Sequence, residues 1–303
     1  MHNRRDFLRG FSGLGIGLAL GPANAAPSTA IERAIPSSGE LLPVIGLGTW
    51  ISFDIGDDVD ARPQRLKVLQ AFFEHGGGMI DSSPMYGSAE YVLGGLLKNI
   101  PAARKLFAAS KVWTLGKQRG IEQMEASRKL WGGPRFDLVQ VHNLLDWEAH
   151  LETLTAWKRE GRIRYLGITT SHGRRHDEME RIMHKVLLDF VQFTYNISDR
   201  EAEQRLLPLA RERRIAVIAN RPFQHGDLFK RVKGKPLPVW AREFDCDNWA
   251  QFFLKFIVAH PAVTCAIPAT RQPAHLIENM GAGVGRLPDA AMRQRMAQHF
   301  EKM

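Results

Sequence analysis

The sequence predicts a single domain of the α/β class, a (β/α)8 TIM barrel. Two observations predict it: eight short apolar runs alternate with helical segments after residue 30, and no linker divides the 303-residue chain. Strict alternation of strand and helix implies parallel strands joined by right-handed crossovers, and eight such units close into a barrel. Such barrels commonly occupy about 250 residues as one domain. We therefore expect residues 31–303 to form one barrel.

The eight apolar runs are expected to be the barrel strands. Each is too short for an average helix and is bounded by polar, glycine or proline residues. They cover residues 43–50 (PVIGLGTW), 77–83 (GGMIDSS), 105–113 (KLFAASKVW), 136–143 (FDLVQVHN), 163–170 (IRYLGITT), 189–196 (DFVQFTYN), 215–223 (IAVIANRPF) and 263–270 (VTCAIPAT). The preceding residues 35–43 (IPSSGELLP) are expected to form a small hairpin or lid at the barrel floor.

The segments between these runs carry apolar residues at helical spacing, and several end in glycine after basic residues, as helices prefer. They cover residues 66–76, 89–99, 121–132, 147–161, 179–188, 204–214 and 248–260. An open, doubly wound sheet is the competing architecture. Its dinucleotide-binding form needs a glycine fingerprint after the first strand, and GLGTW (46–50) lacks the third glycine.

The composition is that of a globular protein, with 44% apolar and 24% charged residues, which excludes disorder and a collagen-like fibre. The net charge of +9 is scattered along the chain, and no stripe of aromatic and basic residues accompanies it, so no nucleic-acid partner is expected. Cys246 and Cys265 provide no disulfide framework. Two free thiols are expected, and a single bridge between them is the alternative.

The N-terminus has the three parts of an export signal. Residues 3–10 (NRRDFLRG) are basic, residues 11–21 (FSGLGIGLALG) are weakly apolar, and ANA precedes Ala26. Arg4 and Arg5 make residues 1–25 a predicted twin-arginine signal, which implies the twin-arginine export machinery as partner and the periplasm as destination. The apolar part is too short for a permanent span, no other stretch could cross a membrane, and retention as an anchor is the alternative to cleavage. Because this route exports folded proteins, a cofactor bound in the cytoplasm is expected.

Three polar residues stand at the ends of consecutive predicted strands. Asp81, Lys111 and His142 are 30 residues (81 to 111) and 31 residues (111 to 142) apart, each about one βα unit. The carboxyl ends of barrel strands carry the chemistry, so these side chains are expected to converge on one rim. Tyr86 lies in the loop after Asp81 and can lean over the same point. These four residues are the predicted catalytic group.

The group makes chemical sense as an acid catalyst. A phenol has a pKa of about 10 and is a poor proton donor at neutral pH, but a neighbouring ammonium stabilises its phenolate. Lys111 can supply that ammonium, and Asp81 can keep a buried lysine charged. His142 offers a donor to a substrate oxygen or a proton relay to Tyr86.

With these residues in place, the chain resembles the aldo/keto reductase family. The motifs GLGTW, IDSSPMYGSAEYVLGGLL, ASKVW, VQVHN, LGITT, VQFTYN and IPATRQPAHLIENM match in order from about residue 43 to 282. The resemblance implies reduction of a small-molecule carbonyl, an aldehyde or ketone, with Tyr86 as general acid, Lys111 and Asp81 tuning it, and His142 positioning the carbonyl. No metal is implied, and a metal-dependent barrel hydrolase lacks clustered ligands because the histidines are dispersed.

The resemblance also implies a nicotinamide dinucleotide, usually NADPH, across the barrel mouth. By position, the cofactor contacts are Thr49, Trp50, Thr169, Thr170, Gln192, Arg221, Pro222, Phe223, Thr270, Arg271, His275, Glu278 and Asn279. Trp50 and Trp113 are expected to wall the substrate pocket. Ala269 and His275 stand where NADPH-preferring members commonly carry Lys and Arg, so Arg271 is expected to grip the 2′-phosphate and give a moderate preference for NADPH over NADH.

One position departs from the family pattern. After the seventh strand many members carry an aromatic that stacks on the nicotinamide, and here Asn220 takes its place. Stacking on the nicotinamide is therefore not expected here. Separately, a second class of function is kept beside the reductase: a cofactor-binding sensor or partner-docking subunit on the same barrel.

Overall fold

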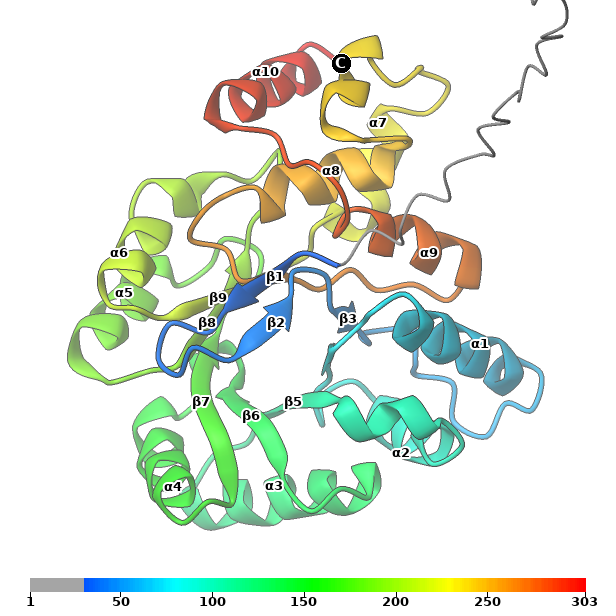
Figure 1. Ribbon diagram of the computed structural model, residues 1–303. Helices are drawn as coiled ribbons and strands as arrows, with labels where there is room; N and C mark the ends of the chain where they lie inside the picture. The colour runs from blue at the N-terminus through cyan, green and yellow to red at the C-terminus, as the bar shows by residue number, and fades with distance from the viewer. Residues whose placement is uncertain (1–29) are drawn as a thin grey trace, which may run out of the picture.

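A computed structural model describes residues 30–303, and the predicted signal segment, residues 1–25, lies outside the described residues. Eight parallel strands form one sheet whose spatial order follows the chain (Figure 1). They are β3 (Leu47–Gly48), β4 (Met79–Asp81), β5 (Phe107–Val112), β6 (Phe136–Val141), β7 (Ile163–Thr169), β8 (Phe190–Thr194), β9 (Ala216–Asn220) and β10 (Cys265–Ala266). Each lies inside one of the predicted runs. The predicted single-domain (β/α)8 barrel is confirmed.

The barrel closes where its first and last strands meet. Parallel bridges join Ile45 to Ala266 and Gly48 to Ala269. A Cβ on Gly48 would lie 2.8 Å from the carbonyl oxygen of Ile267, so only glycine permits this approach. The closure places the residues that follow Gly48 beside the end of β10.

A two-stranded hairpin covers the amino-terminal end of the barrel, as predicted. β1 (Glu32–Ala34) pairs antiparallel with β2 (Leu41–Pro43). Buried Ile35 and Leu42 from this hairpin pack against the barrel interior. That interior is filled by Met79, Phe107, Ala109, Leu138, Tyr165, Phe190, Ala216, Ile218, Cys265 and Ile267. The polar side chains of a functional site are therefore expected at the opposite end of the barrel, where the strands have their carboxyl ends.

Helices surround the sheet and bury their apolar faces against its outer surface (Figure 1). Seven were predicted: α1 (Ala61–Glu74), α2 (Ala89–Leu97), α3 (Lys117–Trp131), α4 (Trp147–Arg159), α5 (His176–Lys185), α6 (Leu206–Glu212) and α8 (Trp249–Val258). α9 (Pro273–Gly281) begins where a last helical segment was expected. The structure adds α7 (Asp227–Arg231) and α10 (Ala290–Glu301), which the apolar spacing did not predict.

A buried carboxylate braces the strand that carries Lys111. Glu90 on α2 accepts hydrogen bonds from Ser110 Oγ (2.5 Å), Ser127 Oγ (2.6 Å) and Trp131 Nε1 (3.1 Å). Burial raises the pKa of Glu90, while these donors and the charge of Lys111 oppose the rise. The contacts tie α2, β5 and α3 together directly behind the predicted catalytic lysine.

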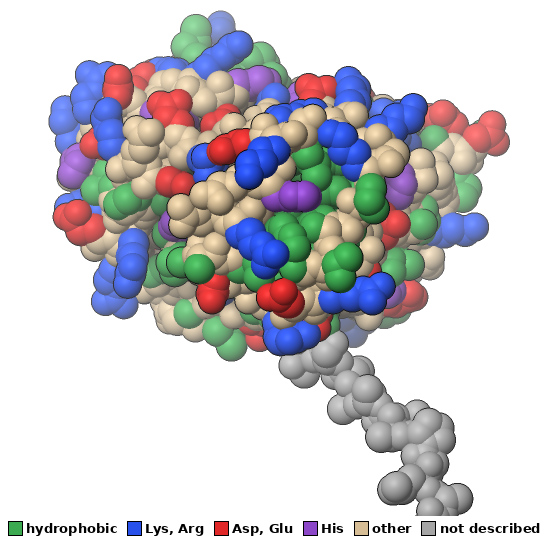
Figure 2. All heavy atoms as spheres, turned by 90° about the horizontal axis from the view of Figure 1, so that it is seen from above, with side chains coloured by type: hydrophobic (Ala, Val, Ile, Leu, Met, Phe, Trp, Pro, Cys, Tyr) green, Lys and Arg blue, Asp and Glu red, His purple; other side chains and the backbone are tan. Residues whose placement is uncertain are grey.

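Both cysteines are free and buried, and burial raises the pKa of each thiol to about 12. On the face seen in Figure 2, acidic and basic side chains are mixed, as expected from charges that are scattered along the sequence. From residue 30 to 303, no helix combines the length and the apolar character that crossing a membrane requires.

Candidate active site

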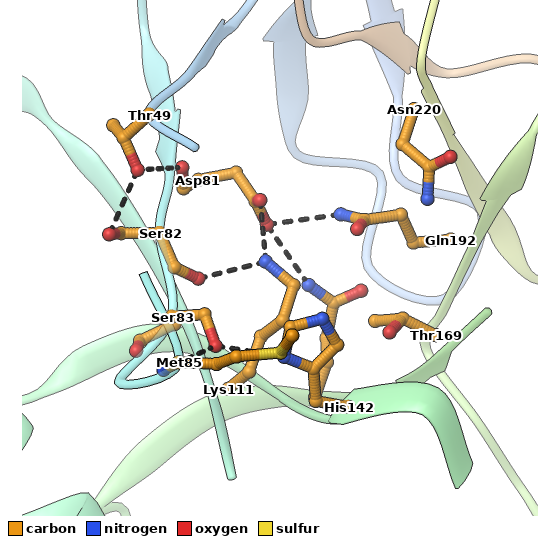
Figure 3. A network of polar contacts seen from close by, with 12 residues as sticks. Thr49, Asp81, Ser82, Ser83, Met85, Lys111, His142, Thr169, Gln192 and Asn220 are labelled. Carbon is orange, nitrogen blue, oxygen red and sulfur yellow. Dashed lines mark hydrogen bonds and ion pairs between the residues drawn. The ribbon is translucent and has the colours of Figure 1, made fainter. Parts of the chain in front are cut away.

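The four predicted catalytic residues meet at the carboxyl end of the barrel. Asp81 is the last residue of β4, Lys111 lies near the end of β5, and His142 directly follows β6. Tyr86 stands in the loop between β4 and α2. In Figure 3 the side chains of Asp81 and Lys111 point toward each other, with His142 beside them. One rim therefore carries a carboxylate, an ammonium, a phenol and an imidazole.

Asp81 and Lys111 form a buried ion pair. Lys111 Nζ lies 2.5 Å from Asp81 Oδ2 and donates to the carbonyl oxygen of Ser82 at 2.8 Å. Gln192 and Gln140 donate to the other carboxylate oxygen, at 3.0 and 3.3 Å. Burial pulls the pKa of Lys111 down, but the charge of Asp81, together with Tyr86 and the hydrogen bonds to both, outweighs it, so this pKa is raised. Asp81 thus keeps a buried lysine charged, as predicted.

Tyr86 lies against both Lys111 and His142. Lys111 Nζ is 5.1 Å from the centre of the phenol ring, and the rings of Tyr86 and His142 meet edge to face with centroids 5.6 Å apart. Burial raises the pKa of Tyr86, and the charge and hydrogen bond of Lys111 oppose the rise. As expected from the sequence, Lys111 acts to lower the pKa of Tyr86. Burial has the larger effect, so this pKa is raised overall.

His142 is buried and neutral. Burial and the charge of Lys111 lower its pKa to about 2. Its Nδ1 lies 2.8 Å from Ser83 Oγ, which also accepts the Met85 N–H at 3.2 Å. The Ser83 hydroxyl proton finds its acceptor only if Nδ1 is unprotonated, because no other acceptor contacts it among the described residues. His142 then carries its proton on Nε2, as a donor.

A cavity of about 760 Å³ opens above these residues. Its volume is within the range of ligand pockets, about 300 to 1,000 Å³. Of the predicted site residues, Thr49, Trp50, Asp81, Tyr86, His142, Thr169, Thr170, Gln192, Arg221, Pro222, Phe223, Thr270 and Arg271 line it. Lys111 lies beneath its floor. The structure thus brings most of the predicted set to one cavity.

Besides Lys111, four predicted residues do not line this cavity. Trp113 follows β5 and is not among the residues that line the cavity, so its predicted place in the pocket wall stays a prediction. His275, Glu278 and Asn279 lie on α9, where Asn279 is buried and the other two are exposed. Their predicted contacts with the adenosine end of a cofactor stay predictions.

The cavity lining fits a ligand that carries an amide. Thr170 is buried, and its Oγ1 has no hydrogen-bond partner among the described residues. An unpaired buried hydroxyl is costly unless a ligand satisfies it. Asn220 is instead engaged: its amide donates to the Thr170 carbonyl at 2.8 Å and accepts from Thr194 Oγ1 at 2.9 Å. Asn220 therefore links the ends of three neighbouring strands, at the position where the family pattern has an aromatic.

Sequence reasoning missed Ser83 and Gln140. The motif around Tyr86 contains Ser83, but nothing in its spacing predicts contact with a histidine 59 residues away. Gln140 sits in an apolar strand run and reaches Asp81 from inside the barrel. Among residues 30–303, no group of three or more His, Cys, Asp and Glu side chains is placed to hold a metal ion.

The chain is similar to known proteins along most of its length. A model of the aldo/keto reductase family matches residues 44–297. A methylglyoxal reductase of Escherichia coli (strain K12) is 28% identical over 261 residues, covering 82% of this chain and 88% of that protein. An NADH-specific methylglyoxal reductase of the same strain is 25% identical over 236 residues, covering 65% and 69%.

A solved structure of a Klebsiella pneumoniae aldo-keto reductase in complex with NADPH has the same fold. Its TM-score is 0.68 at 23% sequence identity, and the match covers 91% of this chain and 96% of the other. The family match spans nearly the whole barrel, from the closing strand β3 to α10. The chain belongs to the aldo/keto reductase family.

Proposed function

We propose that the protein is an NAD(P)H-dependent oxidoreductase that reduces an aldehyde or ketone to an alcohol, with Tyr86 as general acid. The observation that carries the proposal is the assembled group of Tyr86, Lys111, Asp81 and His142 beneath a cavity large enough for a substrate. The cofactor, when bound, supplies the hydride that adds to the carbonyl carbon. A sensor has no need of the complete group, so the enzyme is favoured over the sensor.

The side chains have separate tasks in this reaction. His142, with its proton on Nε2, donates a hydrogen bond to the carbonyl oxygen and holds it beside the Tyr86 hydroxyl. Tyr86 gives its proton to the oxygen as negative charge develops there. Its raised pKa keeps the phenol protonated through neutral pH, and the Lys111 ammonium stabilises the phenolate that remains.

The residues of the cavity fit a nicotinamide cofactor. Thr170 Oγ1 and the Gln192 amide would hold its carboxamide, and Arg271, whose side chain makes no hydrogen bond or ion pair with the described residues, would meet a phosphate. NADPH is the proposed cofactor, and NADH is the alternative, since one relative is NADH-specific by name. Methylglyoxal, which two relatives reduce by name, is the first substrate to try.

Replacing Tyr86 by Phe removes the proton donor and little volume. We expect kcat for carbonyl reduction to fall by about 10² to 10⁴, the usual contribution of general acid catalysis. The Kd of NADPH should stay within about threefold, because the phenol is assigned no cofactor contact in this account. Loss of NADPH absorbance and quenching of protein fluorescence measure the two quantities. Lys111→Met should damage kcat comparably.

Tyr91 supplies the matched control for that variant. It lies half-exposed on α2, and its hydroxyl donates to Asp57 at 2.9 Å, away from the cavity. Tyr91→Phe should keep the wild-type kcat. The assignment of Tyr86 is wrong if Tyr86→Phe retains more than about a tenth of wild-type activity.

Arg271 is expected to read the 2′-phosphate of NADPH. A charge-assisted hydrogen bond of about 1.5 to 3 kcal/mol corresponds to roughly a tenfold to hundredfold preference for NADPH over NADH. In Arg271→Ala this ratio of Kd values should fall toward one, mainly through weaker NADPH binding. Titration of both reduced cofactors into both proteins measures it. Equal affinities in the wild type, or an unchanged ratio in the variant, would show that Arg271 does not read the phosphate.

We also infer that residues 1–25 direct export of the folded, cofactor-loaded protein to the periplasm by the twin-arginine machinery. The support is the Arg4–Arg5 pair, the short apolar segment and the small residues before Ala26. Replacing both arginines by lysine keeps the charge and should leave the protein in the cytoplasm. Cell fractionation with immunoblotting measures this, and unchanged periplasmic protein in the double variant would contradict it.

A further inference from the structure

One side of the cavity is strongly cationic. His172, Arg174 and Arg175 come from the loop after β7, and Arg221 and His225 come from the loop after β9. The only carboxylate in the lining is Asp81, which is already paired with Lys111 at 2.5 Å. This side of the cavity therefore has positive charge without a counter-charge in the lining.

Arg221 stands at the centre of this cationic side. Its Nη1 contacts Nε2 of both His172 and His225, and its Nη2 donates to Gln224 Oε1 at 3.0 Å. Its Nε is buried without a partner among the described residues. Asp199 and Asp227 lie near enough to raise the pKa of Arg221, but neither forms an ion pair with it in the described chain.

The two histidines beside Arg221 do not neutralise it. A guanidinium can donate to both Nε2 atoms only if each imidazole is neutral and carries its proton on Nδ1. Burial and the neighbouring arginine charge lower the pKa of both histidines, in agreement with that state. Near neutral pH, the group formed by His172, Arg221 and His225 thus carries one positive charge, on the arginine.

Arg174 adds a second free charge to the same side. Its side chain makes no hydrogen bond or ion pair with any residue of the described chain, and its charge lowers the pKa of both His172 and Arg221. Its neighbour Arg175 differs, since Glu178 binds it through two nitrogens and the Asn143 carbonyl accepts from it. Two guanidinium groups that repel each other are thus left facing one cavity.

The backbone of this side is strained. His172, Arg221 and His225 have φ angles of 65°, 51° and 57°, in the left-handed region that non-glycine residues rarely adopt. Such conformations persist where the surrounding structure enforces them, and they gather at ligand sites. Packing alone gives no reason for three such residues to bring their cationic or imidazole side chains together.

Part of the cavity mouth is apolar. Trp50, Met85 and Phe229 line the cavity and remain partly exposed, and the Trp50 ring meets the His225 ring edge to face at 4.5 Å. A ligand that matches this lining has an apolar body and an anionic end.

We propose that Arg174 and Arg221, with the flanking His172 and His225, form a subsite for an anionic group of the substrate, so that the substrate class is an aldehyde or ketone bearing a carboxylate or phosphate. This inference rests on the proposed reductase function. The cofactor, when bound, would supply a hydride to the carbonyl carbon, the C=O π pair would take the Tyr86 proton, and the anionic group would be unchanged. Arginine forks suit both carboxylate and phosphate.

The cofactor is the other source of an anion, because it carries phosphates. The position of Arg174 favours the substrate as the source of the anion. Arg221 follows β9 and is itself a predicted cofactor contact, so Arg174 decides between the two sources. Arg271, the predicted phosphate contact, follows β10, whereas Arg174 follows β7, three strands away around the barrel. The experiment therefore includes an arm for the cofactor.

Two pairs of probes test the subsite: 4-carboxybenzaldehyde against benzaldehyde, and succinic semialdehyde against butanal. In the wild type, at least one acid should exceed its uncharged partner in kcat/KM by about tenfold or more, the usual effect of a charge-assisted pair. Arg174→Gln should remove most of that preference through KM, with the uncharged aldehydes unaffected. Arg159→Gln on the exposed face of α4 removes the same charge away from the cavity and should change nothing.

A binding measurement separates this inference from the proposed function. Isothermal titration of 4-(hydroxymethyl)benzoate into the protein saturated with NADP⁺ should show binding that weakens about tenfold in Arg174→Gln, even if no aldehyde is reduced. If 4-(hydroxymethyl)benzoate binds as expected but no aldehyde is reduced, the result contradicts the proposed reductase function and leaves the subsite standing. The subsite is wrong if the wild type does not prefer the carboxylate-bearing aldehydes in kcat/KM. It is also wrong if Arg174→Gln keeps that preference unchanged. A loss of NADPH affinity in Arg174→Gln without loss of carboxylate binding would overturn it as well.

Discussion

The ion pair between Asp81 and Lys111 is the interaction on which the active site depends. An ammonium placed in a fully buried position loses its hydration and tends to lose its proton. Asp81 Oδ2 at 2.5 Å and the Ser82 carbonyl at 2.8 Å replace that hydration. With the charge retained, Lys111 can oppose the effect of burial on the Tyr86 phenol and help to keep His142 neutral. Removal of either partner would leave an uncompensated charge among the remaining residues.

The barrel supplies the geometry for this pair. Parallel pairing sets Asp81 on β4 opposite Ala109 on β5, so Lys111 lies two residues further toward the carboxyl end, within reach of the carboxylate. Glu90 fixes β5 from the helical side through Ser110, the residue before Lys111. Gly48 lets β3 approach β10, and this closure positions Thr49, whose hydroxyl donates to the Asp81 carbonyl at 3.0 Å. The catalytic arrangement is thus a consequence of strand register and closure.

Much of the fold could be predicted because barrel strands are short, apolar and separated by amphipathic helices. Each predicted run contains one strand, and the convergence of Asp81, Lys111 and His142 followed from their positions at strand ends. α10 was missed because its sequence, AAMRQRMAQHFE, buries only Met296, Ala297 and Phe300 and lacks a clear apolar stripe. Trp113 was placed in the pocket wall by resemblance to the family, and the described cavity does not include it, so this placement stays a prediction.

Other features of the site depend on tertiary contacts that no local pattern encodes. Ser83 meets His142 only because β4 and β6 are held two strands apart, and the net direction of the Tyr86 pKa depends on how much surface the loops cover. The cationic side of the cavity joins two loops about 50 residues apart, and the sequence does not show that these loops meet. The sequence thus predicts which polar and titratable side chains are present. The fold determines which of them meet and in which direction their pKa values shift.

The central claim is that burial raises the pKa of the Tyr86 phenol and that the Lys111 ammonium holds the rise in check. Ultraviolet titration of tyrosinate absorbance tests it most directly, with the Tyr86→Phe protein subtracted to isolate this phenol among the four tyrosines. We expect Tyr86 to ionise above the ordinary tyrosine value of about 10, and its pKa to rise further in Lys111→Met. Ionisation at or below that ordinary value, or no rise in Lys111→Met, would contradict it.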